Sequence, residues 1–90
     1  MYDAIKTTCK RDINGNRYII GIMQVIDTVY RFRQQVQGQY SIEQNHLMVA
    51  REVLMKAVEN INHVSLIHAT ISEKEHVFIV VKNGYEIEIF

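Results

Sequence analysis

The side chains best suited to chemistry are arginines and tyrosines that lie close together in the N-terminal half of the chain. This set consists of Arg11, Arg17, Tyr18, Tyr30, Arg31 and Arg33. Arginine side chains bind phosphate oxygens through two parallel hydrogen bonds, and tyrosine rings stack on nucleobases. We therefore interpret the set as a candidate site for an anionic, nucleotide-like small molecule at a subunit boundary. The alternative is that the rings pack in the core and the arginines are solvated or pair with glutamates of a neighbouring copy.

Other reactive residue types do not occur in the patterns that metal sites, nucleophiles or phosphate loops require. The histidines at 46, 63, 68 and 76 include no His-x3-His pair, and the single cysteine excludes a Cys-x2-Cys pair. We expect each histidine to be a surface or partly buried side chain, and Cys9 to pack in the core beside Ile20. No glycine-rich phosphate loop is present either. The sequence thus predicts no metal, no cofactor and no catalytic residue, and hence a protein that is not an enzyme.

Composition is that of an ordinary globular domain. The chain has 90 residues, 48% of them hydrophobic and 22% charged, which predicts a single domain over residues 1–90. The formal net charge is zero, which disfavours general binding to duplex nucleic acid. The chain has one cysteine, no secretory leader and no apolar run long enough to span a membrane. We therefore expect a cytoplasmic protein with no membrane partner.

Two Asn-Gly dipeptides, at residues 14–15 and 83–84, separate segments rich in β-forming residues. Asn and Gly tolerate the positive φ angles of a type I′ turn, so each dipeptide predicts a hairpin with a two-residue loop. In the first hairpin this loop would pair Cys9 with Ile20. Ile20 and Ile22 would then point into the core.

Residues 27–37 follow the first hairpin and fit two patterns. Apolar side chains recur there at helical spacing, and Gly38 could end a helix. Tyr30 and Phe32 also alternate with arginines, which would suit a strand. We predict a short helix and keep the strand as the alternative.

The clearest predicted element is an amphipathic helix over residues 42–62. Ser41 and Gln44 have the spacing of a capping box, in which each side chain bonds the backbone N–H of the other residue. An apolar stripe follows at helical spacing. It consists of Leu47, Ala50, Leu54, Ala57, Val58 and Ile61.

The pattern of the last third of the sequence predicts a β-meander, with strands at 64–71, 77–82 and 85–90. The fold class is therefore α+β. Antiparallel hairpins in the order ββ-α-α-βββ pack on one long amphipathic helix.

The predicted strand 77–82 is apolar on both faces, and one of these faces needs a cover. Val77, Ile79 and Val81 would share this face with Glu86 and Glu88 of the last strand. Monomeric proteins rarely leave such a patch in water. We therefore expect the chain to form a homo-oligomer.

These features favour a small non-enzymatic interaction or inhibitor protein that acts as a homo-oligomer and binds another protein. Small size and the lack of catalytic motifs are compatible with the inhibitor, sponge or adaptor proteins that phages and mobile elements carry. The alternative function is a binder that sequesters an anionic nucleotide-like molecule through the arginines and tyrosines of residues 11–33.

Overall fold

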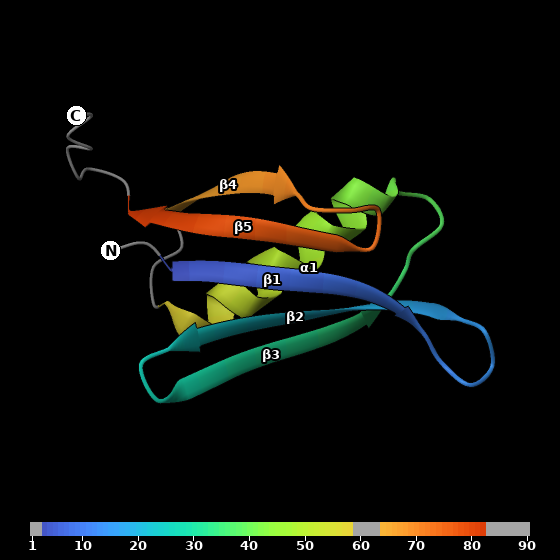
Figure 1. Ribbon diagram of the computed structural model, residues 1–90, viewed down its shortest axis with the longest axis horizontal. Helices are drawn as coiled ribbons and strands as arrows, with labels where there is room; N and C mark the ends of the chain where they lie inside the picture. The colour runs from blue at the N-terminus through green and yellow to red at the C-terminus, as the bar shows by residue number, and fades with distance from the viewer. Residues whose placement is uncertain (1–2, 59–63, 83–90) are drawn as a thin grey trace.

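Within the described residues, five antiparallel strands form one sheet, and a single helix crosses one of its faces (Figure 1). The computed structural model describes residues 3–58 and 64–82. The elements are β1 (Asp3–Arg11), β2 (Arg17–Val25), β3 (Thr28–Gln35), α1 (Ile42–Ala57), β4 (Val64–Thr70) and β5 (Glu75–Lys82). The strand order in the sheet is β3-β2-β1-β5-β4, so the first strand of the chain lies at the centre.

The α+β class is confirmed, but the predicted element order is wrong, because the described residues contain one helix in the order βββ-α-ββ. The segment 27–37 forms β3 instead of a helix. Its side chains alternate between half-buried residues, such as Tyr30 and Phe32, and exposed arginines. Tyr30 pairs with Met23 of β2, so the two-residue periodicity decides the conformation by placing its aromatic rings over the core.

The first hairpin has a longer loop than predicted, and this shifts its register by one residue. Gly15 has a φ of 83°, and its N–H donates to the Asp12 carbonyl at 3.0 Å. The Asp12 carboxylate also accepts from the backbone N–H groups of Asn14 and Asn16, each at 2.9 Å. These bonds favour a three-residue loop with a type I turn and a glycine bulge over a type I′ turn.

The shift exchanges the two faces of β2. Cys9 pairs with Ile19 rather than Ile20. Ile19 and Met23 are therefore buried, whereas Ile22 is 36% exposed on the opposite face. The prediction that Ile20 and Ile22 point into the core was wrong for this reason.

The capping box at the start of α1 is confirmed. The Gln44 N–H donates to Ser41 Oγ, and the Ser41 N–H donates to Gln44 Oε1, both at 3.1 Å. The helix ends at Ala57, five residues before the predicted end at 62, and Val58 is already extended. Its buried positions are Asn45, His46, Val49, Ala50, Val53 and Leu54, so the buried face is rotated relative to the predicted stripe.

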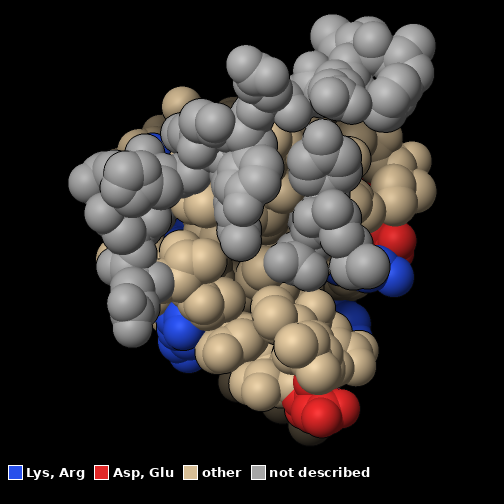
Figure 2. All heavy atoms as spheres, turned by 90° about the vertical axis from the view of Figure 1, so that its left-hand side faces the viewer, with Lys and Arg blue, Asp and Glu red and all other residues tan. Residues whose placement is uncertain are grey.

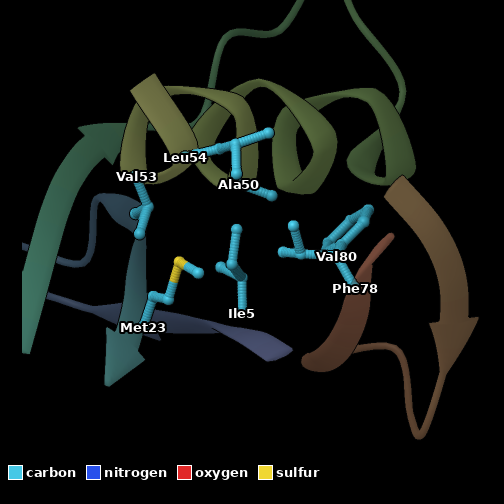
Figure 3. Packing of buried hydrophobic residues seen from close by; sticks show 7 residues of the cluster. All are labelled: Ile5, Met23, Ala50, Val53, Leu54, Phe78 and Val80. Atoms are coloured by element: carbon cyan, nitrogen blue, oxygen red, sulfur yellow. The ribbon is translucent and has the colours of Figure 1, made fainter. Parts of the chain in front are cut away.

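The hydrophobic core lies between α1 and the three central strands (Figure 3). It consists of Ile5, Met23, Ala50, Val53, Leu54, Phe78 and Val80. The helix lies close to the sheet at Gly21, where a Cβ atom would stand 2.8 Å from methyl groups of both Val49 and Val53. The predicted turn at 83–84 and the predicted strand 85–90 lie outside the described residues. Within the described part of the chain, no helix has the length and apolar character needed to cross a membrane.

Candidate functional site

The face of the sheet opposite α1, called here the open face, carries a group of aliphatic side chains. No helix or strand of residues 3–58 and 64–82 covers it. Its aliphatic residues are Ile20 and Ile22 of β2, Ile67 of β4, and Val77 and Ile79 of β5. Ile67 is 52% exposed and the β5 pair is half-buried, while Val81, predicted to share this face, is buried. The open face is thus an apolar surface on both sides of the central strand.

Three of the six predicted ligand-binding residues lie on this open face. The guanidinium of Arg33 stacks over the Tyr18 ring, 3.7 Å from its centroid. Arg31 points to the same side from the edge strand β3, opposite Ile22. Lys6 lies beside them on β1 and forms an ion pair with Glu75 at 3.2 Å. Basic and aromatic side chains therefore border the aliphatic surface.

A cleft of about 800 Å³ lies among residues of the first hairpin, the start of α1 and the loop between β4 and β5. Figure 1 shows these three segments together at its right-hand end. The Cys9 N–H donates to the Lys74 carbonyl at 2.7 Å, which ties the β4–β5 loop to β1. The lining residues are Cys9, Lys10, Arg11, Arg17, Ile42, Glu43, Thr70, Glu73, Lys74 and His76. Cys9 therefore borders this cleft and is half-buried, so the expected core position beside Ile20 was wrong.

The cleft brings together positive charge that is not neutralised by ion pairs. Four basic residues and two acidic residues line it. The ion pair found among residues 3–58 and 64–82 joins Lys6 and Glu75, so none of these six residues forms an ion pair with another described residue. At the opposite end of the molecule, by contrast, the visible charged side chains lie scattered around the margin (Figure 2).

Behind the cleft, three imidazole rings stack in a row. The rings of His46 and His76 are nearly parallel, with centroids 3.7 Å apart. His68 Nε2 lies 2.6 Å from His76 Nδ1, and the His68 ring also stacks on Phe78. His46 and His76 are 0% and 1% exposed, so the expectation of surface or partly buried histidines was wrong for both.

Thr7 holds the first ring of this stack. Its hydroxyl donates to the His76 carbonyl at 3.5 Å and accepts from His46 Nδ1–H at 2.6 Å. His46 Nε2 is then an unprotonated acceptor, and it has no hydrogen-bond partner within the described residues. Burial, together with the nearby His76 and His68, lowers the pKa of His46 to about 4. His46 is therefore neutral at pH 7.

Burial also lowers the pKa of His76, with His68 acting in the same direction and Glu43 opposing both. The rings stack rather than converge on one point. Accordingly, no group of three histidine, cysteine or acidic side chains within the described ranges could hold a metal ion. The histidine stack is therefore a packing feature rather than a metal site.

The six predicted ligand-binding residues thus lie in three places. Arg11 and Arg17 line the cleft. Tyr18, Arg31 and Arg33 lie on the open face, and Tyr30 is half-buried against the core. No protein-family model, curated protein or solved structure matches the chain. The open face and the cleft together hold five of these six residues.

The burial of His46 and His76 could have been predicted from the periodicity of their elements, although a search for metal-binding spacings does not reveal it. His76 shares strand parity with Phe78, and His46 precedes Val49 and Ala50 at helical spacing. Each histidine therefore falls on the core face of its element.

Proposed function

We propose that the protein is a non-enzymatic interaction protein that associates with a second copy of itself through the open face and acts as an inhibitor or adaptor. The observation that carries this proposal is the aliphatic surface of β2, β4 and β5, which no described element covers. Burying such side chains stabilises a complex by about 25 cal/mol per Å² of apolar surface removed from water.

The size of the open face suits a stable interface. Five strands spaced about 4.8 Å apart, each contributing roughly seven residues at about 3.3 Å per residue, span about 24 by 23 Å. This is a flat area of about 550 Å², and side-chain relief increases it toward the roughly 800 Å² that each partner buries in a standard interface. A second copy offers a matching surface of the same size.

The charge distribution is compatible with a partner that covers the aliphatic side chains of β2 and β5. Arg31 and Arg33 lie on β3, which is an edge strand, so their charged groups can remain in water when the centre is covered. Lys6 lies nearer the centre, where Glu75 neutralises it. A two-fold pairing of open faces therefore need not bury an unpaired charge at β1 and β5.

The test is a measurement of mass in solution with a matched pair of variants. In sedimentation velocity at 1–100 μM (on the order of the affinities expected for a standard interface), the wild type should approach twice its monomer mass of 10.6 kDa. Ile22→Lys should shift the protein to monomer while its far-ultraviolet circular dichroism is retained. Ile13→Lys is the control, because Ile13 is 99% exposed in the first hairpin loop and not on the open face.

A wild-type protein that stays at 10.6 kDa over this range would contradict self-association. Equal dissociation of both lysine variants would place the interface elsewhere. If the monomer instead copurifies with another protein and Ile22→Lys releases it, the open face is an interface for that partner rather than for a second copy.

A further inference from the structure

We propose that the cleft at the start of α1 binds a small molecule that carries adjacent phosphoryl groups, of the nucleoside diphosphate or triphosphate class. This inference is independent of self-association, because the cleft lies at the end of the sheet and not on the aliphatic part of the open face. Three separate observations converge on it.

The first observation is a pair of like charges in direct opposition. Arg11 and Arg17 face each other as the last cross-strand pair of β1 and β2. Like charges in this position destabilise a hairpin. Neither guanidinium forms an ion pair with a carboxylate of the described residues, and within these residues the one hydrogen bond that either makes is from Arg11 Nη1 to the Gly15 carbonyl at 3.1 Å. A phosphoryl group between the two would turn the repulsion into two charge-assisted contacts.

The second observation is that further donors reach the same cleft from other elements. Lys74 comes from the β4–β5 loop. Ile42 and Glu43 line the cleft in the first turn of α1, and their backbone N–H groups have no acceptor among the described residues. Free N–H groups at a helix N-terminus bind phosphate oxygens and add the positive end of the helix dipole.

The third observation is the size and the chemistry of the lining. A volume of about 800 Å³ exceeds the need of inorganic phosphate and falls in the range of small-molecule sites. The side chain of Ile42, the thiol of Cys9 and the imidazole of His76 supply a less polar wall beside the cations. This wall suits a sugar and base, while the cations suit the phosphates.

The acidic residues in the lining argue for more than one phosphoryl group. Glu43 and Glu73 offset two of the four basic charges, which leaves a net charge of 4 − 2 = +2. Because basic and acidic residues are mixed in the lining, a single phosphate would bind there only weakly in competition with its hydration by water. A diphosphate can contact the Arg11–Arg17 pair and the helix terminus at once, and so gains from multiple fixed donors.

The experiment compares binding by isothermal titration calorimetry for ADP, ATP, pyrophosphate and adenosine, with wild type, Arg17→Gln and Arg31→Gln. Arg31 is the matched control, because it is an exposed arginine on the open face rather than in the cleft. We expect ADP and ATP to bind more tightly than pyrophosphate and adenosine not to bind. Arg17→Gln should weaken ADP binding at least tenfold, whereas Arg31→Gln should leave it within about twofold.

Folding of the test variant is checked separately by its melting temperature without ligand. Because Arg17→Gln removes a like-charge opposition, the free variant should melt at or above the wild-type temperature. Absence of ADP and ATP binding to the wild type at millimolar concentration overturns the proposal, as does equal weakening by the two variants. Binding of a short single-stranded oligonucleotide that depends on Arg31 and not on Arg17 would also overturn it, because the basic open face would then be the anion site.

Discussion

His46 is a buried imidazole that makes one strong hydrogen bond and leaves its second ring nitrogen unpartnered within the described residues. Its ring is enclosed by the stacked ring of His76 and by the helix to which it belongs. A proton added to Nε2 would place a charge in this site without an acceptor. Ionisation of this residue therefore opposes folding.

This arrangement predicts a loss of stability in mild acid. The pKa of His46 is about 4 in the folded protein and 6.5 in the unfolded chain, so the unfolded chain binds more protons between these values. The stability that neutral His46 contributes to the folded protein is fully present above pH 6.5 and is lost as the pH falls toward 4. Between pH 7 and pH 5 the free energy of unfolding should decrease by about 2 kcal/mol from this residue.

Urea denaturation at both pH values measures this decrease. His46→Gln keeps a polar group that can bond Thr7 but does not titrate, so its stability should vary less between the two pH values. An unchanged pH dependence in this variant would show that other groups are responsible.

Ile26 is the other residue with a specific energetic consequence, because it adopts a φ of 55° in the turn between β2 and β3. A β-branched side chain in the left-handed region costs roughly 1–2 kcal/mol. Since Ile26 is 86% exposed, no packing offsets this cost. Asparagine tolerates the same conformation, so Ile26→Asn should raise the free energy of unfolding by about 1 kcal/mol.

Thermal melts of Ile26→Asn and Ile13→Asn make the comparison directly. Ile13 is also exposed in a hairpin loop but does not have a positive φ, so its variant should melt within about one degree of the wild type. Equal stabilisation by both substitutions would attribute the gain to reduced surface hydrophobicity instead of backbone strain.

At the scale of elements, the fit between α1 and the sheet depends on the absence of a side chain at Gly21. A methyl group there would meet Val49 and Val53 at 2.8 Å, and short branched side chains on a helix cannot turn away easily. Gly21→Ala should therefore destabilise the protein by about 1–3 kcal/mol. Adding Val49→Ala to this variant should recover part of the loss, because the two sites couple directly.

Chemical denaturation of the single and double variants measures this coupling. Gly38→Ala is the matched control, since no atom lies within 4 Å of the position its Cβ would occupy. If Gly21→Ala and Gly38→Ala are equally stable, the helix is free to move away from the sheet.

The elements also show which parts of the fold the sequence could predict. The α1 start was predictable because a capping box is a local device that needs only Ser41 and Gln44. The first hairpin was misregistered because its loop depends on the Asp12 carboxylate, whose bonds to Asn14 and Asn16 compete with the turn that an Asn-Gly dipeptide favours. The conformation of residues 27–37 was ambiguous because the segment fits both a helical and a strand pattern. Pairing of β3 with β2 decides between them.

The same difference between local and tertiary interactions explains which parts of the candidate site could be predicted from the sequence. Arg11 and Arg17 flank the first hairpin loop in the sequence, but only the observed register, in which they pair with each other, places both in one cleft. Lys74 and the start of α1 could not be added, because the β4–β5 loop reaches β1 only through tertiary pairing. Arg31 and Arg33 were grouped with them because they lie close by in the sequence, and strand alternation places them on the opposite face.

At the scale of the whole molecule, the open face and the cleft should behave as independent sites. Ile22 lies in the middle of β2, whereas Arg17 begins that strand at the cleft. Ile22→Lys should therefore abolish self-association and leave ADP affinity within about twofold. Arg17→Gln should weaken ADP binding at least tenfold and leave self-association intact. Paired calorimetry and sedimentation on both variants test this separation, and loss of both properties in either variant would contradict it.

The central position of β1 also determines the order in which the sheet can assemble. Its pairing with β2 joins neighbouring segments, but its pairing with β5 joins Ile5 to Phe78, near the two ends of the described chain. Closing so long a loop is slow, so the three-stranded meander of β1, β2 and β3 can form well before β5 pairs with β1. During synthesis, the backbone of β1 then remains an unpaired edge until β5 emerges, and during this interval the exposed edge makes the nascent chain prone to aggregation.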